Sequence, residues 1–194
     1  MYVHEQAVAG FGTFRLRPLD AEGDAATVHA WVSEERAAFW GMTGMTRDQV
    51  AQTYAHMATL DTHHAFLAEL DGGPVALFQT YEPSADRVGE CYDVAPGDIG
   101  AHVLLAPADG GGARPGWSTA LLGVLARYVL VGMDRRRIVV DPDVRNGKAV
   151  ARFRRMGFDT GPVVTLPEVD LPEVYLPEKR AQLAFFRREV AFPG

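Results

Sequence analysis

The most constraining feature of the chain is a strand-like segment followed directly by a glycine-rich loop and a strongly apolar helix. Residues 99–105 predict a largely buried strand, residues 108–116 form the loop, and residues 117–131 predict the helix. A helix N-terminus after such a loop offers unpaired backbone N–H groups and the positive end of a dipole. Taken alone, the segment favours an ordinary connection between strand and helix, and a site where a phosphate approaches the backbone is the alternative.

The remaining elements predict one α/β domain over residues 1–194. The predicted strands are 11–18, 65–70, 75–81, 99–105, 137–140, 163–166 and 174–176. The predicted helices are 21–33, 46–60, 117–131, 146–156 and a C-terminal helix at about 178–190. Early strands joined by a hairpin and later strands joined by helical crossovers predict a mixed twisted sheet with helices on both faces.

Local signals mark four of these boundaries. Thr46 is a candidate N-cap for the second helix. Asp71-Gly72-Gly73 predicts a tight hairpin turn. Gly157 is a typical helix stop, and Asp143 is expected to cap the helix that begins near Asn146.

Charge and cysteine content exclude several classes of protein. The formal net charge is −6, which disfavours a generally basic nucleic-acid surface. The single cysteine, Cys91, excludes an internal disulfide framework and a cysteine-built metal site. The longest apolar stretch, 120–133, contains Arg127 and is too short to span a bilayer. We expect a cytoplasmic protein with no metal, nucleic-acid or membrane partner, as a monomer or homodimer.

The motif in residues 146–158, NGKAVARFRRMGF, resembles a conserved segment of the GNAT acetyltransferase superfamily. In that family the preceding strand, loop and helix bind the pyrophosphate and pantetheine of acetyl-coenzyme A. The predicted element order is also that of the family. The resemblance implies the GNAT fold, with two central parallel strands that splay apart.

Smaller segments are similar to the siderophore-biosynthesis acyltransferases, the branch that includes the aerobactin, desferrioxamine and mycobactin enzymes. The segments are residues 29–31, 36–42, 97–105, 140–146 and 176–181. The resemblance implies acyl transfer from acetyl- or succinyl-coenzyme A to an N-hydroxylated diamine or amino acid, which gives a hydroxamate. The acceptor classes are hydroxycadaverine, hydroxyputrescine, hydroxylysine and hydroxyornithine.

The resemblance implies a set of residues along acyl-coenzyme A: Leu104, Leu105, Arg114, Gly116, Trp117, Ser118, Asn146 and Phe153. Two positions depart from the superfamily pattern. Trp117 stands where the phosphate loop usually ends in a small residue. Phe153 stands where many members have a tyrosine that protonates the departing thiolate, and a phenyl ring donates no proton.

The same resemblance assigns two catalytic side chains. His102, on the central strand, corresponds to a histidine that faces the acceptor and accepts its proton. Asp141, at the end of the next strand, corresponds to an acidic residue that orients the acceptor or the imidazole, with Asp143 as the rival. A buried structural histidine and a turn carboxylate are the alternatives.

The resemblance places the acceptor pocket near the first helices. Its candidate residues are Trp31, Arg36, Phe39, Trp40 and Glu82, with Arg36 for a carboxylate and Glu82 for an ammonium. Two other functions stay open. An aminoglycoside or protein N-terminal acetyltransferase would keep the fold and change the acceptor. A non-catalytic module would bind coenzyme A alone.

Overall fold

The computed structural model describes residues 1–107, 115–171 and 174–192. The chain forms two compact units, Met1–Gln79 with His102–Ala126, and Thr80–Ala101 with Arg127–Gly194. Strands β4 and β5 each run from one unit into the other.

An eight-stranded mixed sheet has the order β1-β2-β3-β4-β5-β6-β10-β7, as the sequence predicts for the fold class. Its strands are β1 His4–Val8, β2 Gly12–Pro18, β3 His63–Leu70, β4 Gly73–Tyr81, β5 Asp98–Leu105, β6 Arg137–Val140, β7 Asp159–Leu166 and β10 Lys179–Arg187. A separate two-stranded sheet consists of β8 Val169–Leu171 and β9 Val174–Leu176.

The parallel central pair is β5 with β6. Ile99 pairs with Ile138 and Gly100 with Val139, after which β5 continues to Leu105. The predicted parallel arrangement is confirmed, and the parting of the two strands beyond these pairs stays a prediction.

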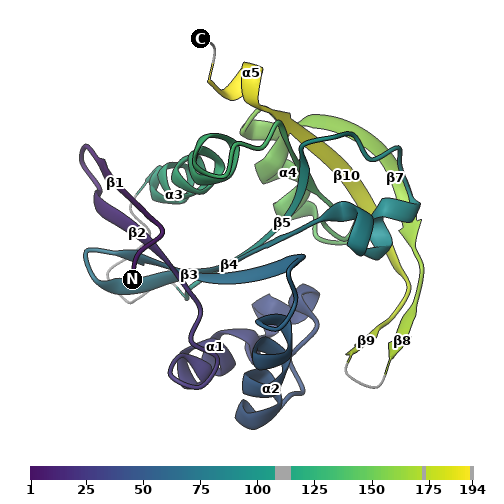
Figure 1. Cartoon of the computed structure of the whole chain (residues 1–194), viewed down its shortest axis with the longest axis horizontal. Coiled ribbons are helices and arrows are strands. Elements are labelled where there is room, and N and C mark those ends of the chain that lie inside the picture. Colours follow the sequence, from purple (N-terminus) through teal and green to yellow (C-terminus); the bar gives the residue numbers. More distant parts are fainter. Residues whose placement is uncertain (108–114, 172–173, 193–194) are drawn as a thin grey trace. The chain divides into compact units, whose positions relative to one another are not determined.

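Helices cover both faces of the sheet in the first unit (Figure 1). α1 Ala25–Val32 and α2 Arg47–Met57 pack together on one face, and α3 Trp117–Arg127 lies on the other. The 3-10 helix η1 Glu35–Trp40 connects α1 to the segment before α2. A core of buried side chains lies between α1, α2 and the sheet: Val28, Trp31, Val32, Ala37, Met42, Val50, Tyr54, Leu67, Leu77 and Leu104.

Capping and turn chemistry explain two well-predicted boundaries. The Thr46 side chain accepts from the Gln49 amide and the Gln49 side chain accepts from the Thr46 amide, which is a complete capping box. Between β3 and β4, Asp71 and Gly72 have φ of 50° and 88°, the left-handed pair that a tight hairpin requires.

The second unit contains α4 Gly147–Arg155 beside the strands β6, β10 and β7. Its short helical elements are η2 Pro83–Ala85 and η3 Arg87–Glu90 between β4 and β5, the π-helical η4 Tyr128–Gly132 before β6, and α5 Arg188–Ala191 after β10. Its core contains Tyr81, Val88, Leu166, Ala181 and Leu183.

The predicted C-terminal helix at 178–190 is wrong. Residues 179–187 form β10, which pairs antiparallel with β6 on one side and with β7 on the other. Two ladders of backbone hydrogen bonds and the burial of Leu183 outweigh the helix propensity of KRAQLAFF. Only the short α5 follows as helix within the described residues.

Two smaller expectations also need correction. β1 is an edge strand that the sequence patterns do not predict, and β2 holds it in the register His4–Leu16 to Val8–Gly12. Asp143 does not cap α4, because the N-cap is Asn146, whose side chain accepts from the Ala149 amide at 3.2 Å.

Candidate active site

His102 lies on β5 in the first unit and is partly buried. Its ring is edge-on to Trp40, with centroids 6.3 Å apart and an interplanar angle of 73°. Trp40 is the last residue of η1, so two elements far apart in sequence bring these rings together. The predicted catalytic histidine therefore has a predicted acceptor-pocket residue beside it.

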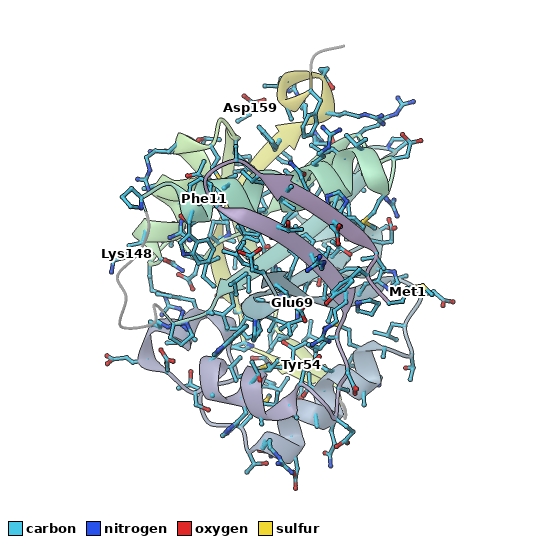
Figure 2. The ribbon with its side chains drawn as sticks, turned by 90° about the vertical axis from the view of Figure 1, so that its left-hand side faces the viewer. Met1, Phe11, Tyr54, Glu69, Lys148 and Asp159 are labelled. Carbon is cyan, nitrogen blue, oxygen red and sulfur yellow. The ribbon has the colours of Figure 1, made fainter. Side chains whose placement is uncertain are left out.

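A buried tyrosine holds Trp40 in place. The Trp40 indole Nε1 donates to the Tyr54 hydroxyl at 3.2 Å, and Gln79 donates to the same oxygen at 3.1 Å. Tyr54 in turn donates to the sulfur of Met42 at 3.8 Å. Burial raises the pKa of Tyr54, so the hydroxyl stays protonated and can both accept and donate. Figure 2 shows Tyr54 among the helices, below the strands where Glu69 is labelled.

Arg36 ties η1 to the end of the central strand. Its Nη1 donates to the Leu105 carbonyl at 2.7 Å and its Nε donates to Glu34 at 2.6 Å. Phe39 is 47% exposed, whereas Trp31 is 7% exposed and belongs to the hydrophobic core, as does Leu104. Arg36, Trp40 and His102 thus all belong to the first unit. Trp31 belongs to its buried core and not to its surface.

Asp141 directly follows β6 in the second unit and is 3% exposed. Its Oδ1 accepts from the Tyr81 hydroxyl at 3.1 Å, and its Oδ2 accepts from Lys179 Nζ at 2.7 Å. The salt bridge compensates a carboxylate that would be costly to bury alone. Tyr81 is itself buried, and burial followed by the negative charge of Asp141 raises the pKa of its hydroxyl.

Asp143, the alternative acidic residue, forms an ion pair with Arg145, two residues further along the chain. Arg145 donates from Nε to Oδ1 at 2.9 Å and from Nη2 to Oδ2 at 2.7 Å, and the Arg145 amide also donates to Oδ1 at 2.8 Å. The hydrogen bonds from Arg145 outweigh desolvation and hold the pKa of Asp143 below its usual value. These bonds fix the turn that precedes α4.

Glu82, the residue predicted for a substrate ammonium, pairs with the guanidinium of Arg135 in the same unit. Both side chains are about one-third exposed, at 33% and 28%. Glu82 therefore already pairs with a cationic side chain of this chain.

The residues predicted along coenzyme A fall in both units. In the first, Gly116 has φ +81°, and among the described residues an added Cβ would meet Phe11 Cζ, at 3.5 Å. α3 begins at Trp117 with no acidic residue in its first turn, and Ser118 is partly buried there. An anionic group fits a helix N-terminus that has no acidic residue in its first turn and follows a glycine with positive φ. Arg114 lies outside the described residues.

In the second unit, Asn146 and Phe153 lie on α4. The Asn146 side chain caps the helix, and the Phe153 ring packs on Phe158 with centroids 5.0 Å apart. The structure thus assigns Asn146 a local structural task and surrounds Phe153 with aromatic packing.

Sequence reasoning missed Tyr54, Tyr81 and Lys179. Tyr54 lies at a helical position whose apolar neighbours predict only core, and Tyr81 ends a predicted strand. Lys179 falls in the segment predicted as a helix, so its approach to Asp141 depends on pairing that the sequence does not display. The similarity of segment 176–181 to the siderophore acyltransferases is its one signal.

A family model described as an acetyltransferase (GNAT) domain matches residues 20–166. The chain belongs to the GNAT acetyltransferase family. The match spans the strands β3 to β7, the helices α1 to α4 and both predicted catalytic positions.

Two curated relatives of the GNAT chain are similar over most of its length. One is the N(6)-hydroxylysine O-acetyltransferase of Escherichia coli, 27% identical over 75% of this chain and 46% of the relative. Another is the N-hydroxyputrescine acetyltransferase of Acinetobacter baumannii, 23% identical over 68% of this chain and 62% of the relative. The matched region thus spans about half to three-fifths of the length of these relatives.

Solved structures share the GNAT fold. An uncharacterized protein from Bacillus halodurans has a TM-score of 0.78 at 22% identity, covering 97% of this chain and 93% of its own. Aminoglycoside acetyltransferase AAC(6')-Ib in complex with coenzyme A has a TM-score of 0.73 at 25% identity, covering 92% of this chain and 96% of its own. Spermidine N-acetyltransferase from Vibrio cholerae has a TM-score of 0.67 at 15% identity, covering 92% and 97%, which shows the fold alone.

Two kinds of feature are absent from the described residues. No helix among residues 1–107, 115–171 and 174–192 is long and apolar enough to cross a membrane. No group of three or more His, Cys, Asp and Glu side chains in that part of the chain could hold a metal ion.

Proposed function

We propose that this GNAT chain is an acyl-coenzyme A-dependent N-acyltransferase that converts an N-hydroxylated diamine or amino acid to a hydroxamate in siderophore biosynthesis. The observation that carries the proposal is the pair of curated relatives, an N(6)-hydroxylysine O-acetyltransferase and an N-hydroxyputrescine acetyltransferase, whose names both specify an N-hydroxylated acceptor. The segments similar to siderophore acyltransferases agree with these matches. The reaction consumes acyl-coenzyme A, and we place it in the cytoplasm for that reason.

The proposed reaction is direct transfer within a ternary complex. The acceptor nitrogen attacks the thioester carbon, a C–N bond forms and the C–S bond breaks. The nitrogen loses one proton and the departing thiolate gains one, so the products are the hydroxamate and free coenzyme A. When bound, acyl-coenzyme A supplies the activated acyl group, as an acetyl or a succinyl thioester.

We assign the proton acceptor to His102. A neutral imidazole has a lone pair for the proton that the nitrogen releases during attack. A hydroxylamine is less basic than an alkylamine and is largely unprotonated at neutral pH. His102 therefore assists the attack without first having to deprotonate an ammonium, and we expect its removal to slow the reaction without abolishing it.

We assign the orientation of the acceptor to Asp141. Its two carboxylate oxygens accept from Tyr81 and Lys179. An acceptor N–H or O–H group would donate to this carboxylate while the contacts with Tyr81 and Lys179 hold it still.

For coenzyme A, the proposed contacts begin at the α3 N-terminus. Gly116, Trp117 and Ser118 would meet the phosphates together with Arg114, and the strand residues Leu104 and Leu105 would lie along pantetheine. In the second unit, Asn146 and Phe153 on α4 are the further positions that the resemblance assigns to coenzyme A. Since Phe153 has no hydroxyl, water is our candidate for protonating the thiolate.

For the acceptor, Trp40 and Phe39 would supply aromatic walls, with Trp31 supporting them from the core. Arg36 would meet a carboxylate in an amino-acid substrate, and Glu82 a distal ammonium. Both of these side chains already have ion-pair partners, so substrate binding would have to share or exchange those contacts.

The second candidate is aminoglycoside acetylation. It is favoured by the 25% identity to AAC(6')-Ib, which is also solved with paromomycin and acetyl-coenzyme A. A cavity of about 730 Å³ in the second unit is lined by Asp86, Glu90 and Asp93, together with Arg87. Carboxylates around a cavity suit a polycation, although Arg87 offsets one of them.

The test is the release of coenzyme A thiol with acetyl- and succinyl-coenzyme A. The acceptors are N-hydroxycadaverine, N-hydroxyputrescine, N-hydroxylysine, N-hydroxyornithine, the parent amines, a peptide with a free N-terminal amino group and kanamycin. Preference for an N-hydroxylated acceptor supports the proposal, and preference for kanamycin or the peptide overturns it. Binding of coenzyme A with no transfer to any of them would favour a non-catalytic module.

A further inference from the structure

The second unit contains a buried contact group around Asp141 that no comparison assigns. Lys179 Nζ lies 2.7 Å from Asp141 Oδ2, and the Tyr81 hydroxyl lies 3.1 Å from Oδ1. Asp141 is 3% exposed, Tyr81 is 2% exposed, and the Lys179 side chain is 22% exposed. The carboxylate is thus held at both oxygens by two different elements, β4 and β10.

The backbone fixes where Lys179 stands. The turn that contains Asp141 pairs with β10: the Val144 amide donates to the Arg180 carbonyl, and the Gln182 amide donates to the Pro142 carbonyl. These bonds set the register of the first residues of β10 against the end of β6. The ammonium reaches Asp141 because the strand, and not a helix, begins at Lys179.

On the other side, the ring of Tyr81 is fixed by Gly100. A Cβ atom at Gly100 would lie 2.1 Å from Tyr81 Cε2, so the ring occupies that space. Tyr81 is fully packed and its hydroxyl can donate to Asp141 without competition from bulk water. The carboxylate therefore has one well-defined orientation.

We propose that Lys179 is a specificity-determining residue that compensates the charge of Asp141, so that the site accepts a neutral hydroxylamine nitrogen in preference to an alkylammonium. This inference rests on the proposed function. An uncompensated buried carboxylate attracts a cation strongly, whereas one paired with an ammonium offers a hydrogen-bond acceptor with little net charge. Tyr81 is the positioning residue that keeps the second oxygen in place.

The selectivity experiment compares Lys179→Met, Lys179→Arg and Lys148→Met with the unmodified protein. Lys148 is the matched control because it is an exposed lysine of the same unit, on α4 (Figure 2). The readouts are kcat/KM for N-hydroxycadaverine and cadaverine, and their dissociation constants in the presence of coenzyme A. We expect Lys179→Met to shift the ratio toward cadaverine by about tenfold, which corresponds to about 1.4 kcal/mol.

Lys179→Arg keeps the positive charge, and we expect it to retain most of the preference, while Lys148→Met leaves it unchanged. An unchanged ratio in a folded Lys179→Met protein would overturn the proposal. A loss of kcat for both acceptors in equal proportion would also overturn it, because that is the effect of a merely structural residue.

A second arm does not depend on turnover. The chain has two lysines, Lys148 and Lys179, so ¹⁵N-lysine labelling gives two ammonium signals. In the unmodified protein, we expect one of the two ammonium signals, that of Lys179, to show slow proton exchange. This signal should be absent from Lys179→Arg, and in Asp141→Asn it should exchange fast. Two fast-exchanging ammonium groups would contradict the contact itself. If no acceptor is acylated, the proposed function fails, while this signal and the dissociation constants still decide the role of Lys179.

Discussion

The side chain of Tyr81 occupies the space that a Cβ atom on Gly100 would fill. The two residues belong to neighbouring stretches of β4 and β5, and a Cβ atom on Gly100 would lie 2.1 Å from Tyr81 Cε2. The same ring directs its hydroxyl to Asp141. A glycine in the central strand is thus a requirement of the group that holds the candidate acidic residue.

Gly100→Ala should destabilise the protein, because the added methyl group forces the buried ring to move. Overpacking of this kind costs about 1–3 kcal/mol or more of unfolding free energy, measured by urea unfolding. In the Tyr81→Ala background the same substitution should cost much less. The matched control is Gly123→Ala on α3, where no atom of the described residues outside the helix backbone lies within 4 Å of an added Cβ. That change should be neutral or stabilising by up to about 1 kcal/mol, as in an exposed helix interior. Equal costs at Gly100 in both backgrounds would contradict the packing argument.

His102→Ala should lower kcat/KM by about tenfold or more, or about 1.4 kcal/mol of transition-state stabilisation for each decade. The loss should be smaller with a hydroxylamine acceptor than with the parent amine, because the amine must also lose a proton before attack. Circular dichroism and the melting temperature verify that the variant is folded. If a folded His102→Ala protein acylates both acceptors at the rates of the unmodified protein, His102 takes no part in the reaction.

Tyr54→Phe should lower the unfolding free energy by about 1–3 kcal/mol, since Trp40 and Gln79 would lose the oxygen to which both donate. The KM for the acceptor should rise as well, because Trp40 packs against His102. Urea unfolding and steady-state kinetics measure the two effects. The control is Tyr175→Phe, an exposed tyrosine that donates to Glu168 and should change stability by less than about 0.5 kcal/mol. A Tyr54→Phe protein as stable as the control would contradict the role of this hydroxyl.

Acid should destabilise the fold partly through Asp98. Burial alone would raise the pKa of this carboxyl, but the hydrogen bonds from Arg137, Ala95 and Tyr92 outweigh burial and hold the pKa below its usual value. A carboxyl with a lower pKa in the folded state stabilises the fold above its unfolded pKa of about 3.9. That contribution disappears as the pH falls through the folded-state pKa.

Asp98→Asn should therefore flatten the dependence of unfolding free energy on pH below about pH 4. Urea unfolding at several pH values measures this slope. Asp61→Asn, at an exposed position, is the control and should keep the original slope. A slope that Asp98→Asn leaves unchanged would show that the ion pair with Arg137 does not contribute in acid.

The sequence predicts the parts of the fold that depend on local chemistry. The hairpin at Asp71-Gly72 follows from residues that tolerate positive φ, and α2 begins at Thr46 because a side chain caps its amides. Periodicity and glycine placement locate the strand and helix on either side of the loop at 108–116. These features need no knowledge of distant residues.

The parts that fail depend on pairing between distant segments. The residues of β10 favour a helix in isolation, and their strand conformation comes from neighbours on both sides. The candidate site shows the same division. His102 and Asp141 could be named from motifs, but the contacts of Tyr54 with Trp40 and of Lys179 with Asp141 require strand register and side-chain direction.

The most direct test of the proposed acceptor class is a competition in one reaction. Equimolar N-hydroxycadaverine, cadaverine and kanamycin compete for limiting acetyl-coenzyme A, and mass spectrometry quantifies the acetylated products. We predict that N-acetyl-N-hydroxycadaverine exceeds each other product by about tenfold or more, a difference of about 1.4 kcal/mol in activation free energy. Acetylkanamycin or acetylcadaverine as the main product would contradict the proposed function.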